Sequence, residues 1–361
     1  MRILEVIPLL SIDGGAESFV VYFCNELVRK GHECAILTLY SIDEKLCGEQ
    51  SLSPKVKLFS ANKNKGYDLS CSVKVYSVIK NYAPNVVHTH VGAIPYITLS
   101  AFLYRKSGYF ATIHSEAVRE AGSSYQKWCR QLLFRTGRVR AVTISESSKL
   151  SFETFYKSVP DLVYNGVPSF TDSISREKNK GTIRFIHVAR CHPIKNQELL
   201  LLAFNRVMQH YDNIELDWFG TSLEYPQLFD SLQSLFNNHI HYKGSTRDAR
   251  LEMSNADAFC LTSRMEGMPM TIIEALSVGC IPICTPVGGC KNMIQDGVNG
   301  FLSSDMSVEA YSEAIERFIE TRENEKEMLR KNAIDSFNKY YSIEKTVNDY
   351  LELFQIRIKN L

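Results

Sequence analysis

Two series of short apolar runs that alternate with helical patterns constrain the fold of this chain more than any other feature. In the first series, an apolar run at 2–9 precedes a glycine turn, a helical pattern at 16–30 and a second apolar run at 34–39. The apolar residues of 16–30 recur at helical spacing, and Gly31 is expected to end that helix as a C-cap. A strand, a glycine turn, a helix and a strand in this order predict a βαβ unit with parallel strands.

The alternation continues through the first half and starts again after a polar segment. Further strands are predicted at 86–88, 109–114, 141–144, 162–164, 183–188, 214–219, 239–242, 258–261 and 281–285. Helices are predicted at 196–209, at 308–340, where a break is expected, and at 342–359. Residues 166–181 are rich in Ser, Gly and Lys and are interpreted as the interdomain linker. The prediction is therefore an α/β protein with two doubly wound domains, 1–167 and 168–340, that face each other across a cleft. A helix at 341–361 is expected to pack back toward the first domain.

Composition limits the class of protein. The 361 residues are too many for one ordinary core, and 45% hydrophobic with 22% charged residues is typical of a soluble globular enzyme. A net charge of +1 argues against a nucleic-acid partner. The ten Cys form no CxxC pair, which indicates reduced thiols and a cytoplasmic location. The sequence shows no signal-peptide pattern and no apolar stretch long enough to span a bilayer.

The segment EGMPMTIIE, from Glu266 to Glu274, places two carboxylates eight positions apart. Pro269 suits the first position of the helix that follows, because a missing N–H costs nothing there. Carboxylates beside the unpaired N–H groups of a helix start would suit a ligand with hydroxyl and phosphate groups. The alternative is that Glu266 is a solvated loop residue and that Glu274 only complements the helix dipole.

Two further segments lie at predicted carboxyl ends of strands. Arg190 and Lys195 follow the run 183–188, where two cations could hold a diphosphate, although they could equally be surface cations of a turn. Gly14-Gly15 follows the first strand and would let a ligand approach the backbone, although a tight turn explains the pair as well.

Three histidines also end predicted strands. His114 is the best candidate to contact a sugar or an acceptor, against the common alternative of a packed or capping residue. His88 and His90 form an HxH pattern that could suggest a metal, but no carboxylate or cysteine cluster accompanies it in the sequence. We therefore predict no metal site.

Residues 121–145 contain no acidic residue. Five cations are interleaved with apolar side chains there: Lys127, Arg130, Arg135, Arg138 and Arg140, with Trp128, Leu132, Leu133 and Phe134. This pattern is typical of a basic amphipathic helix that lies on an anionic membrane surface. It is equally typical of a helix that packs its apolar face on a sheet and exposes a basic face.

Taken together, the motifs resemble those of glycosyltransferase family 4, the retaining nucleotide-sugar glycosyltransferases with the GT-B fold, also called glycosyl transferases group 1. The matching segments run in family order over nearly the whole chain: GGAE (14–17), RKGHE (29–33), VVHTH (86–90), TIHS (112–115), VYNGV (163–167), ARCHPIKN (189–196), EGMPMTIIEAL (266–276), and GCIPICTPVGG with DGVNGFL (279–302). Their joint order is far more specific than any one of them.

The resemblance implies a role for each matching residue. The implied donor-binding residues are Gly15, Arg190, Lys195, Thr246, Glu266, Gly267, Met268 and Glu274, and the implied catalytic residues are Glu266, Arg190, Lys195 and His114. The two cations would neutralise the donor diphosphate in place of a metal ion. Glu266 would bond donor-sugar hydroxyls together with the amides of the next two residues, and Glu274 would bond the ribose.

The remaining roles are contacts at the edge of the donor. Gly15 would lie against the phosphate, the backbone of Thr246 would contact the base, and His114 would lie near the donor sugar and the acceptor. Asn292 departs from the family pattern, which usually has Glu at that position, and this puts the packing of the local loop in question.

The resemblance also implies an activity. We expect transfer of a hexose or N-acetylhexosamine from a nucleotide sugar, UDP-linked, to a lipid-linked glycan in bacterial surface polysaccharide or lipopolysaccharide assembly, with no metal and no cofactor. The enzyme would be cytoplasmic or peripheral on the inner face of the cytoplasmic membrane. The alternatives are a small soluble acceptor and a non-catalytic subunit that only binds the sugar nucleotide.

Overall fold

The computed structural model describes residues 1–10, 14–42, 52–64, 66, 68–170, 181–246 and 248–360. The chain divides into two compact units, one made of Met1–Pro168 with Ser342–Leu361 and the other of Ser169–Tyr341. Of the expected linker 166–181, positions 171–180 lie outside the described residues. The linker was placed too early, because Val167 is buried in the first unit and forms a β-bridge with Ser342.

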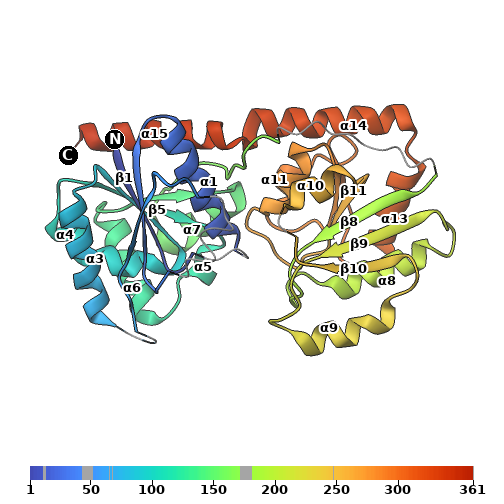
Figure 1. Cartoon of the computed structure of the whole chain (residues 1–361), viewed down its shortest axis with the longest axis horizontal. Helices are drawn as coiled ribbons and strands as arrows, with labels where there is room; N and C mark the ends of the chain where they lie inside the picture. The colour runs from blue at the N-terminus through green and yellow to red at the C-terminus, as the bar shows by residue number, and fades with distance from the viewer. Residues whose placement is uncertain are drawn as a thin grey trace. The chain divides into compact units, whose positions relative to one another are not determined.

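The first unit is built on a parallel seven-stranded sheet (Figure 1). The strand order is β3(Lys57–Ser60), β2(Glu33–Thr38), β1(Arg2–Ile7), β4(Val86–His90), β5(Gly108–Ile113), β6(Arg140–Thr143), β7(Asp161–Leu162). The order reverses direction between β1 and β4. In doubly wound sheets a ligand binds at such a switch point, beyond the carboxyl ends of the strands.

Helices cover both faces of this sheet. They are α1(Gly15–Arg29), α3(Leu69–Tyr82), the 3-10 helix η1(Val91–Ile97), α4(Thr98–Leu103), α5(Ala117–Glu120), α6(Ser124–Arg135), α7(Glu146–Tyr156) and α15(Ile343–Lys359). The C-cap of α1 is Lys30, and Gly31 follows it with φ +82°, so the glycine lies one position later than expected. Ser342 caps α15 by accepting a hydrogen bond from the Lys345 N–H.

The second unit repeats the architecture with six parallel strands. Their order is β10(Ile240–Gly244), β9(Ile214–Phe219), β8(Ile183–Val188), β11(Ala258–Leu261), β12(Ile281–Cys284), β13(Phe301–Leu302). The switch point lies between β8 and β11. The helices are α8(Gln197–Val207), α9(Pro226–Leu232), η2(Gln233–Leu235), α10(Ala249–Ser254), α11(Met270–Ser277), α12(Cys290–Met293), α13(Val308–Glu320), α14(Glu323–Ser336) and the π-helical turn η3(Phe337–Tyr341).

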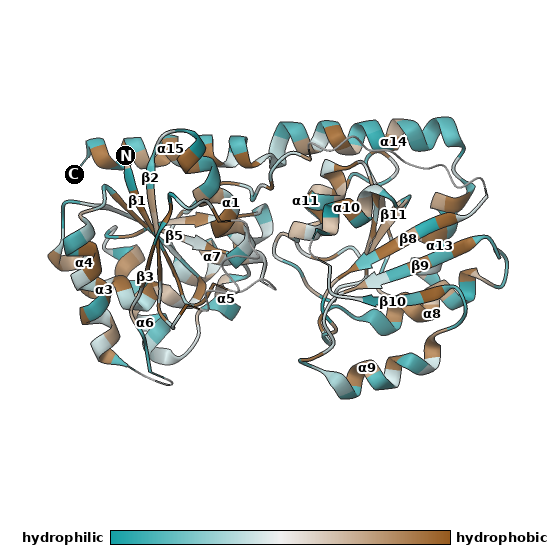
Figure 2. Ribbon diagram, in the orientation of Figure 1, coloured by the Kyte–Doolittle hydropathy of each residue, from teal (hydrophilic) through white to brown (hydrophobic). Residues whose placement is uncertain are grey.

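The α/β class is confirmed, and the central strands of both sheets lie within two residues of their predicted positions. The helical pattern at 308–340 is broken, as expected, because Thr321, the C-cap of α13, and Arg322, the N-cap of α14, both have extended backbone. Hydrophobic residues concentrate along the strands of the first sheet, whereas β9 and β10 of the second sheet also carry hydrophilic residues (Figure 2). No helix within the described part of the chain combines the length and the apolar composition that a membrane span requires.

Candidate functional site

Lys195 and Glu266 meet at the switch point of the second unit. Lys195 lies in the turn after β8, Glu266 follows β11, and these strands are paired neighbours. The Lys195 Nζ donates to Glu266 Oε1 at 2.6 Å, with 24% and 11% of the two side chains exposed. The structure thus brings together two predicted residues 71 positions apart, and both keep some contact with solvent.

The turn that carries Lys195 is fixed by hydrogen bonds to the segment after β11. Thr262 Oγ1 donates to the Lys195 carbonyl at 3.1 Å, and the Arg264 N–H donates to the Ile194 carbonyl at 2.7 Å. Asn196 has φ +53°, a left-handed conformation that Asn adopts more readily than most residues. The cation therefore lies on a turn that is hydrogen-bonded to the loop of the neighbouring strand.

Glu266 is positioned by a hydroxyl and by a pair of glycines. Ser263 Oγ donates to Glu266 Oε1 at 2.6 Å. A Cβ on Gly288 would collide with the Glu266 carbonyl oxygen, and one on Gly289 would collide with the Gly267 carbonyl oxygen. Only glycines permit this packing.

The departure from the family pattern at Asn292 leaves that packing in place. The Asn292 side chain is exposed, while the contact with the Glu266 segment is made by the glycine backbone. Asn292 in place of the family's Glu therefore does not disturb the packing of this loop against Glu266.

The start of α11 lies directly after Gly267 and Met268. Pro269 is the N-cap of this helix, with extended backbone, so the prediction that it would occupy the first helical position was wrong by one residue. The first N–H groups of any helix lack intrahelical partners, and the positive end of the dipole lies there. Glu266 therefore precedes the N-terminus of α11 by only a few residues, as the sequence predicts.

Arg190 has a different carboxylate partner. Its Nη1 donates to Glu224 Oε1 at 2.8 Å, and the side chains are 42% and 46% exposed. The backbone around it is fixed, because Trp218 Nε1 donates to the Ala189 carbonyl and Gln197 Nε2 donates to the Arg190 carbonyl. Glu224, a carboxylate in the loop after β9, belongs to no motif and is not predicted from the sequence.

Glu274 and Thr246 both interact with Asp248, the N-cap of α10. Desolvation raises the pKa of the half-buried Glu274 to about 7, the Asp248 charge adds to this rise, and the Arg250 charge opposes it. Thr246 Oγ1 accepts from the Asp248 N–H at 3.3 Å. Asp248 and Arg250 also went unnoticed in the sequence, since a short Asp-capped helix carries no distinctive signal.

In the first unit, the predicted residues Gly15 and His114 lie at the carboxyl edge of the sheet. Gly15 begins α1 after β1, and His114 follows β5. His114 is half-buried, and its backbone N–H donates to Glu120 Oε1 at 2.6 Å. Burial lowers the pKa of its imidazole to about 3. His114 is therefore a neutral imidazole near pH 7.

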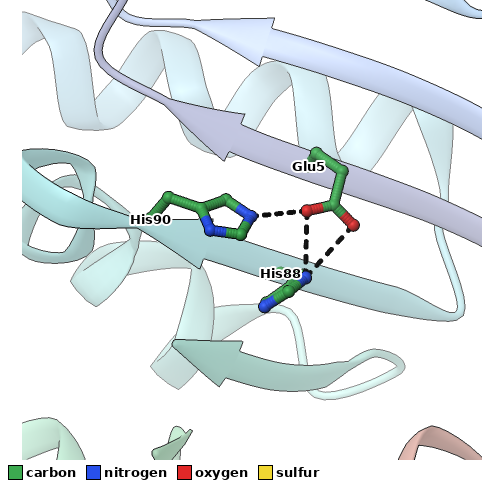
Figure 3. Close-up of side chains that lie close together, drawn as sticks. All are labelled: Glu5, His88 and His90. Atoms are coloured by element: carbon green, nitrogen blue, oxygen red, sulfur yellow. Dashed lines mark hydrogen bonds and ion pairs between the residues drawn. The ribbon is translucent and has the colours of Figure 1, made fainter. Parts of the chain in front are cut away.

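The HxH pattern has a carboxylate beside it, so the premise used to reject a metal was wrong. Glu5 on β1 is opposite His88 in the β1–β4 register, and its Oε2 lies 2.6 Å from His90 Nε2 and 2.9 Å from His88 Nδ1 (Figure 3). All three side chains are fully buried. Because Glu5 is 83 residues from His88 along the chain, only the strand pairing brings them together.

The basic segment 121–145 is not one helix with a cationic face. The helix spans Ser124–Arg135, and β6 takes up Arg140, which pairs with Asp161. Arg130 is 2% exposed, pairs with Glu120 at 3.6 Å and donates to the Val91 carbonyl. Leu133 and Phe134 are in the core, as the packing interpretation expects, while Trp128 is 58% exposed.

Comparisons with known proteins fit this architecture. The model of "Glycosyltransferase Family 4" matches residues 13–169, and that of "Glycosyl transferases group 1" matches 169–336. A protein of Haemophilus influenzae named as an uncharacterized glycosyltransferase is 21% identical over 356 residues, which are 93% of this chain and 95% of that protein.

Two further matches carry more descriptive names. The N,N'-diacetylbacillosaminyl-diphospho-undecaprenol alpha-1,3-N-acetylgalactosaminyltransferase of Campylobacter jejuni is 27% identical over 131 residues, 36% of this chain and 34% of that protein. The crystal structure of Anabaena Alr3699/HepE in complex with UDP and glucose has a TM-score of 0.80 and 19% identity over 98% of this chain and 99% of that one. This likeness shows the fold, two Rossmann-like α/β domains of the GT-B class.

Proposed function

The chain belongs to glycosyltransferase family 4, and from that premise we propose that it transfers a hexose or N-acetylhexosamine from a UDP-linked donor to a lipid-linked glycan, with retention of the anomeric configuration. Its setting would be bacterial surface polysaccharide assembly. The observation that carries the proposal is the Lys195–Glu266 contact at the β8/β11 switch point, beside the start of α11.

Lys195 and Arg190 would hold the donor diphosphate without a metal ion. Departure of a nucleoside diphosphate leaves growing negative charge, and fixed cations together with helix-end N–H groups stabilise such charge. Each cation already has a carboxylate neighbour, Glu266 or Glu224, which keeps its side chain oriented. A diphosphate would share or displace these contacts.

Glu266 would bind hydroxyl groups of the transferred sugar, together with the amides of Gly267 and Met268. Its Oε1 accepts from both Lys195 and Ser263, which fixes the carboxylate. The acceptor hydroxyl would attack from the face that the diphosphate leaves, and the leaving phosphate would take the proton. Glu266 would thus orient the sugar, and the phosphate would act as the base.

The rest of the donor would lie along the carboxyl edge of the second sheet. Glu274 would bond the ribose, and the backbone of Thr246 would contact the base. Uridine is the base we propose, since the Anabaena structure of the same fold is a complex with UDP and glucose.

The lipid-linked acceptor is supported by the name of the Campylobacter relative, a transferase to a diphospho-undecaprenol-linked sugar. The exposed rings of Tyr125 and Trp128 on α6, near Lys127, would suit the headgroup region of a membrane. We therefore propose a peripheral location on the inner face of the cytoplasmic membrane. The burial of Arg130 and the pairing of Arg140 leave fewer cations for this contact than the sequence suggested.

The experiment is a panel of nucleotide sugars offered with and without a polyprenyl-diphosphate-linked saccharide, with release of nucleoside diphosphate as the readout. We expect a UDP-sugar to be turned over only with the lipid-linked acceptor, and the product linkage to keep the donor's anomeric configuration. Turnover with free sugars or small acids alone would favour a soluble acceptor. Tight UDP binding without any turnover would favour a non-catalytic subunit.

A further inference from the structure

A buried ion pair contacts the segments that follow two neighbouring strands of the first unit. Arg130 on α6 is 2% exposed, and its Nη1 lies 3.6 Å from Oε2 of Glu120, the last residue of α5. The Glu120 side chain is itself only 9% exposed. An arginine keeps its charge in proteins, so its burial requires a carboxylate close by. Glu120 meets this requirement for Arg130.

Each partner of the ion pair also holds a stretch of backbone. Arg130 Nη2 donates to the Val91 carbonyl at 2.7 Å, and Glu120 Oε1 accepts from the backbone N–H of His114 at 2.6 Å. Ser115 Oγ lies 3.4 Å from the same carboxylate oxygen. Val91 follows β4 and His114 follows β5, and these strands are paired neighbours. The ion pair therefore joins two adjacent segments at the carboxyl edge of the first sheet.

Val91 has a backbone conformation that needs such support. Its φ is +44°, in the left-handed region, which is a genuine outlier for a β-branched residue. A residue keeps such a conformation only where its surroundings overdetermine it, and such residues concentrate at functional sites. The hydrogen bond from Arg130 to the Val91 carbonyl supplies part of that constraint. Val91 also lies at the β1/β4 switch point, where doubly wound sheets bind ligands.

Stability alone is a poor explanation of this ion pair. Arg130 Nε and Nη1 and Glu120 Oε2 have no hydrogen-bond partner among the residues that the structure describes. Replacing a buried ion pair with apolar side chains of similar size is often neutral or even stabilising. The pair is better explained by the two backbone segments whose direction it fixes.

We propose that Glu120 and Arg130 are positioning residues that hold the segments after β4 and β5 in the conformation that binds the lipid-linked saccharide acceptor. This inference rests on the proposed function, which assigns the donor to the second unit and leaves the carboxyl edge of the first sheet for the acceptor. Val91, His114 and Ser115 are only half-buried, so a ligand can reach them. Glu120 and Arg130 act through the backbone that they hold.

The test replaces both charges together. In Glu120→Gln/Arg130→Met the new amide oxygen can still accept from the His114 N–H, and no charge is left buried alone. The bond to the Val91 carbonyl is lost, and Val91 should relax to a negative φ. Arg105→Met is the matched control, because Arg105 is an exposed arginine before β5 whose Nε donates to a backbone carbonyl at 3.4 Å.

The kinetic readout is the KM for a polyprenyl-diphosphate-linked saccharide, with calorimetric UDP binding measured on the same proteins. The double variant should raise this acceptor KM about tenfold, which corresponds to about 1.4 kcal/mol. It should bind UDP as tightly as the wild type does, because the donor residues belong to the second unit. Arg105→Met should change neither quantity. An unchanged acceptor KM in the folded double variant, or an equal loss of UDP affinity, would overturn the proposal.

A rescue experiment separates positioning from a general loss of structure. Asn adopts the left-handed region more readily than a β-branched residue. Val91→Asn, added to the double variant, should therefore restore most of the lost acceptor affinity. A role in stability alone gives no reason for such a rescue, so a KM that stays high would contradict the proposal.

Arg130→Lys keeps the experiment decisive if the double variant does not fold. It leaves a positive charge beside Glu120 but lacks the planar guanidinium fork that reaches both Glu120 and the Val91 carbonyl. The acceptor KM should rise in this variant as well, and an unchanged KM would overturn the proposal.

Crystal structures give a readout that does not depend on activity. The φ of Val91 should be positive in the wild type and negative in the double variant, and Val91→Asn should make it positive again. A negative φ in the wild type, or an unchanged φ in the double variant, would refute the positioning role. Absence of any turnover by the wild type would instead refute the proposed function, and the crystal structures would still decide whether the ion pair positions the two segments.

Discussion

The two sheets of this protein place opposite kinds of polar group at the same topological position. At the β8/β11 switch point, Lys195 and Glu266 form an ion pair that keeps some exposure to solvent. At the β1/β4 switch point, Glu5, His88 and His90 are fully buried, and burial favours their neutral forms. Charged side chains that keep contact with solvent can hold a charged ligand. Fully buried side chains favour their neutral forms and can only orient hydrogen bonds.

The largest effect should come from removing the fixed cation of the second unit. Lys195→Ala should lower kcat/KM for the nucleotide sugar by about 10²–10³, because one preorganised charge that stabilises the leaving group is lost. Arg206→Ala is the matched control, since Arg206 is an exposed cation on α8 paired with Glu309. Steady-state kinetics on both variants would check this, and a Lys195→Ala enzyme as active as Arg206→Ala would contradict the assignment.

A second prediction tests whether the close approach of Gly288 to the Glu266 backbone is needed for activity. Gly288→Ala should greatly reduce activity without changing any charge, because its Cβ would displace the Glu266 backbone. Gly297→Ala is the control: this glycine also has positive φ, at +71°, but a Cβ there would meet nothing within 4 Å. Both substitutions should cost about 1 kcal/mol of backbone strain. Only Gly288→Ala should impair turnover, and equal activities would mean that the close approach does not position Glu266.

A third prediction separates binding from stability at Arg190. Because the Arg190–Glu224 pair is exposed, breaking it should change the free energy of unfolding by less than about 1 kcal/mol. Arg190→Ala should nevertheless raise KM for the donor about tenfold, while Glu224→Ala should not, since it leaves the cation in place. Thermal unfolding and donor KM on both variants provide the measurement. A similar rise in KM for both would show that the pair, and not the cation, matters.

The smallest effect should be a pH dependence of donor binding set by Glu274. Its pKa of about 7 lies above the ordinary 4.5, so the protonated form predominates below pH 7. If the carboxylate binds the ribose, donor affinity should rise severalfold from pH 6 to pH 8. Glu274→Gln should abolish this rise. Taken alone, the raised pKa also means that stability falls as pH increases from about 4.5 to about 7, because the folded state holds the proton more tightly.

The sequence predicted the charged site better than the neutral one, for a physical reason. Lys195 and Glu266 each follow a strand, and each lies in a short motif of consecutive residues, ARCHPIKN and EGMPMTIIE, that is visible in the sequence. Glu5 is a single carboxyl in an apolar strand, and its partners come from another strand, so only the β1–β4 register reveals them. The sequence also suggested that Arg130 is a surface cation. The structure buries it beside Glu120, a carboxylate just outside the basic segment 121–145.

The central claim is that fixed cations of the second unit grip the donor diphosphate without a divalent ion. The most direct measurement is calorimetric titration of UDP into the wild type and into Lys195→Ala, each with excess chelator and then with Mg²⁺. We predict that the wild type binds equally well under both conditions and that Lys195→Ala binds far more weakly under both. Wild-type binding that requires Mg²⁺, or undiminished binding by Lys195→Ala, would contradict the claim.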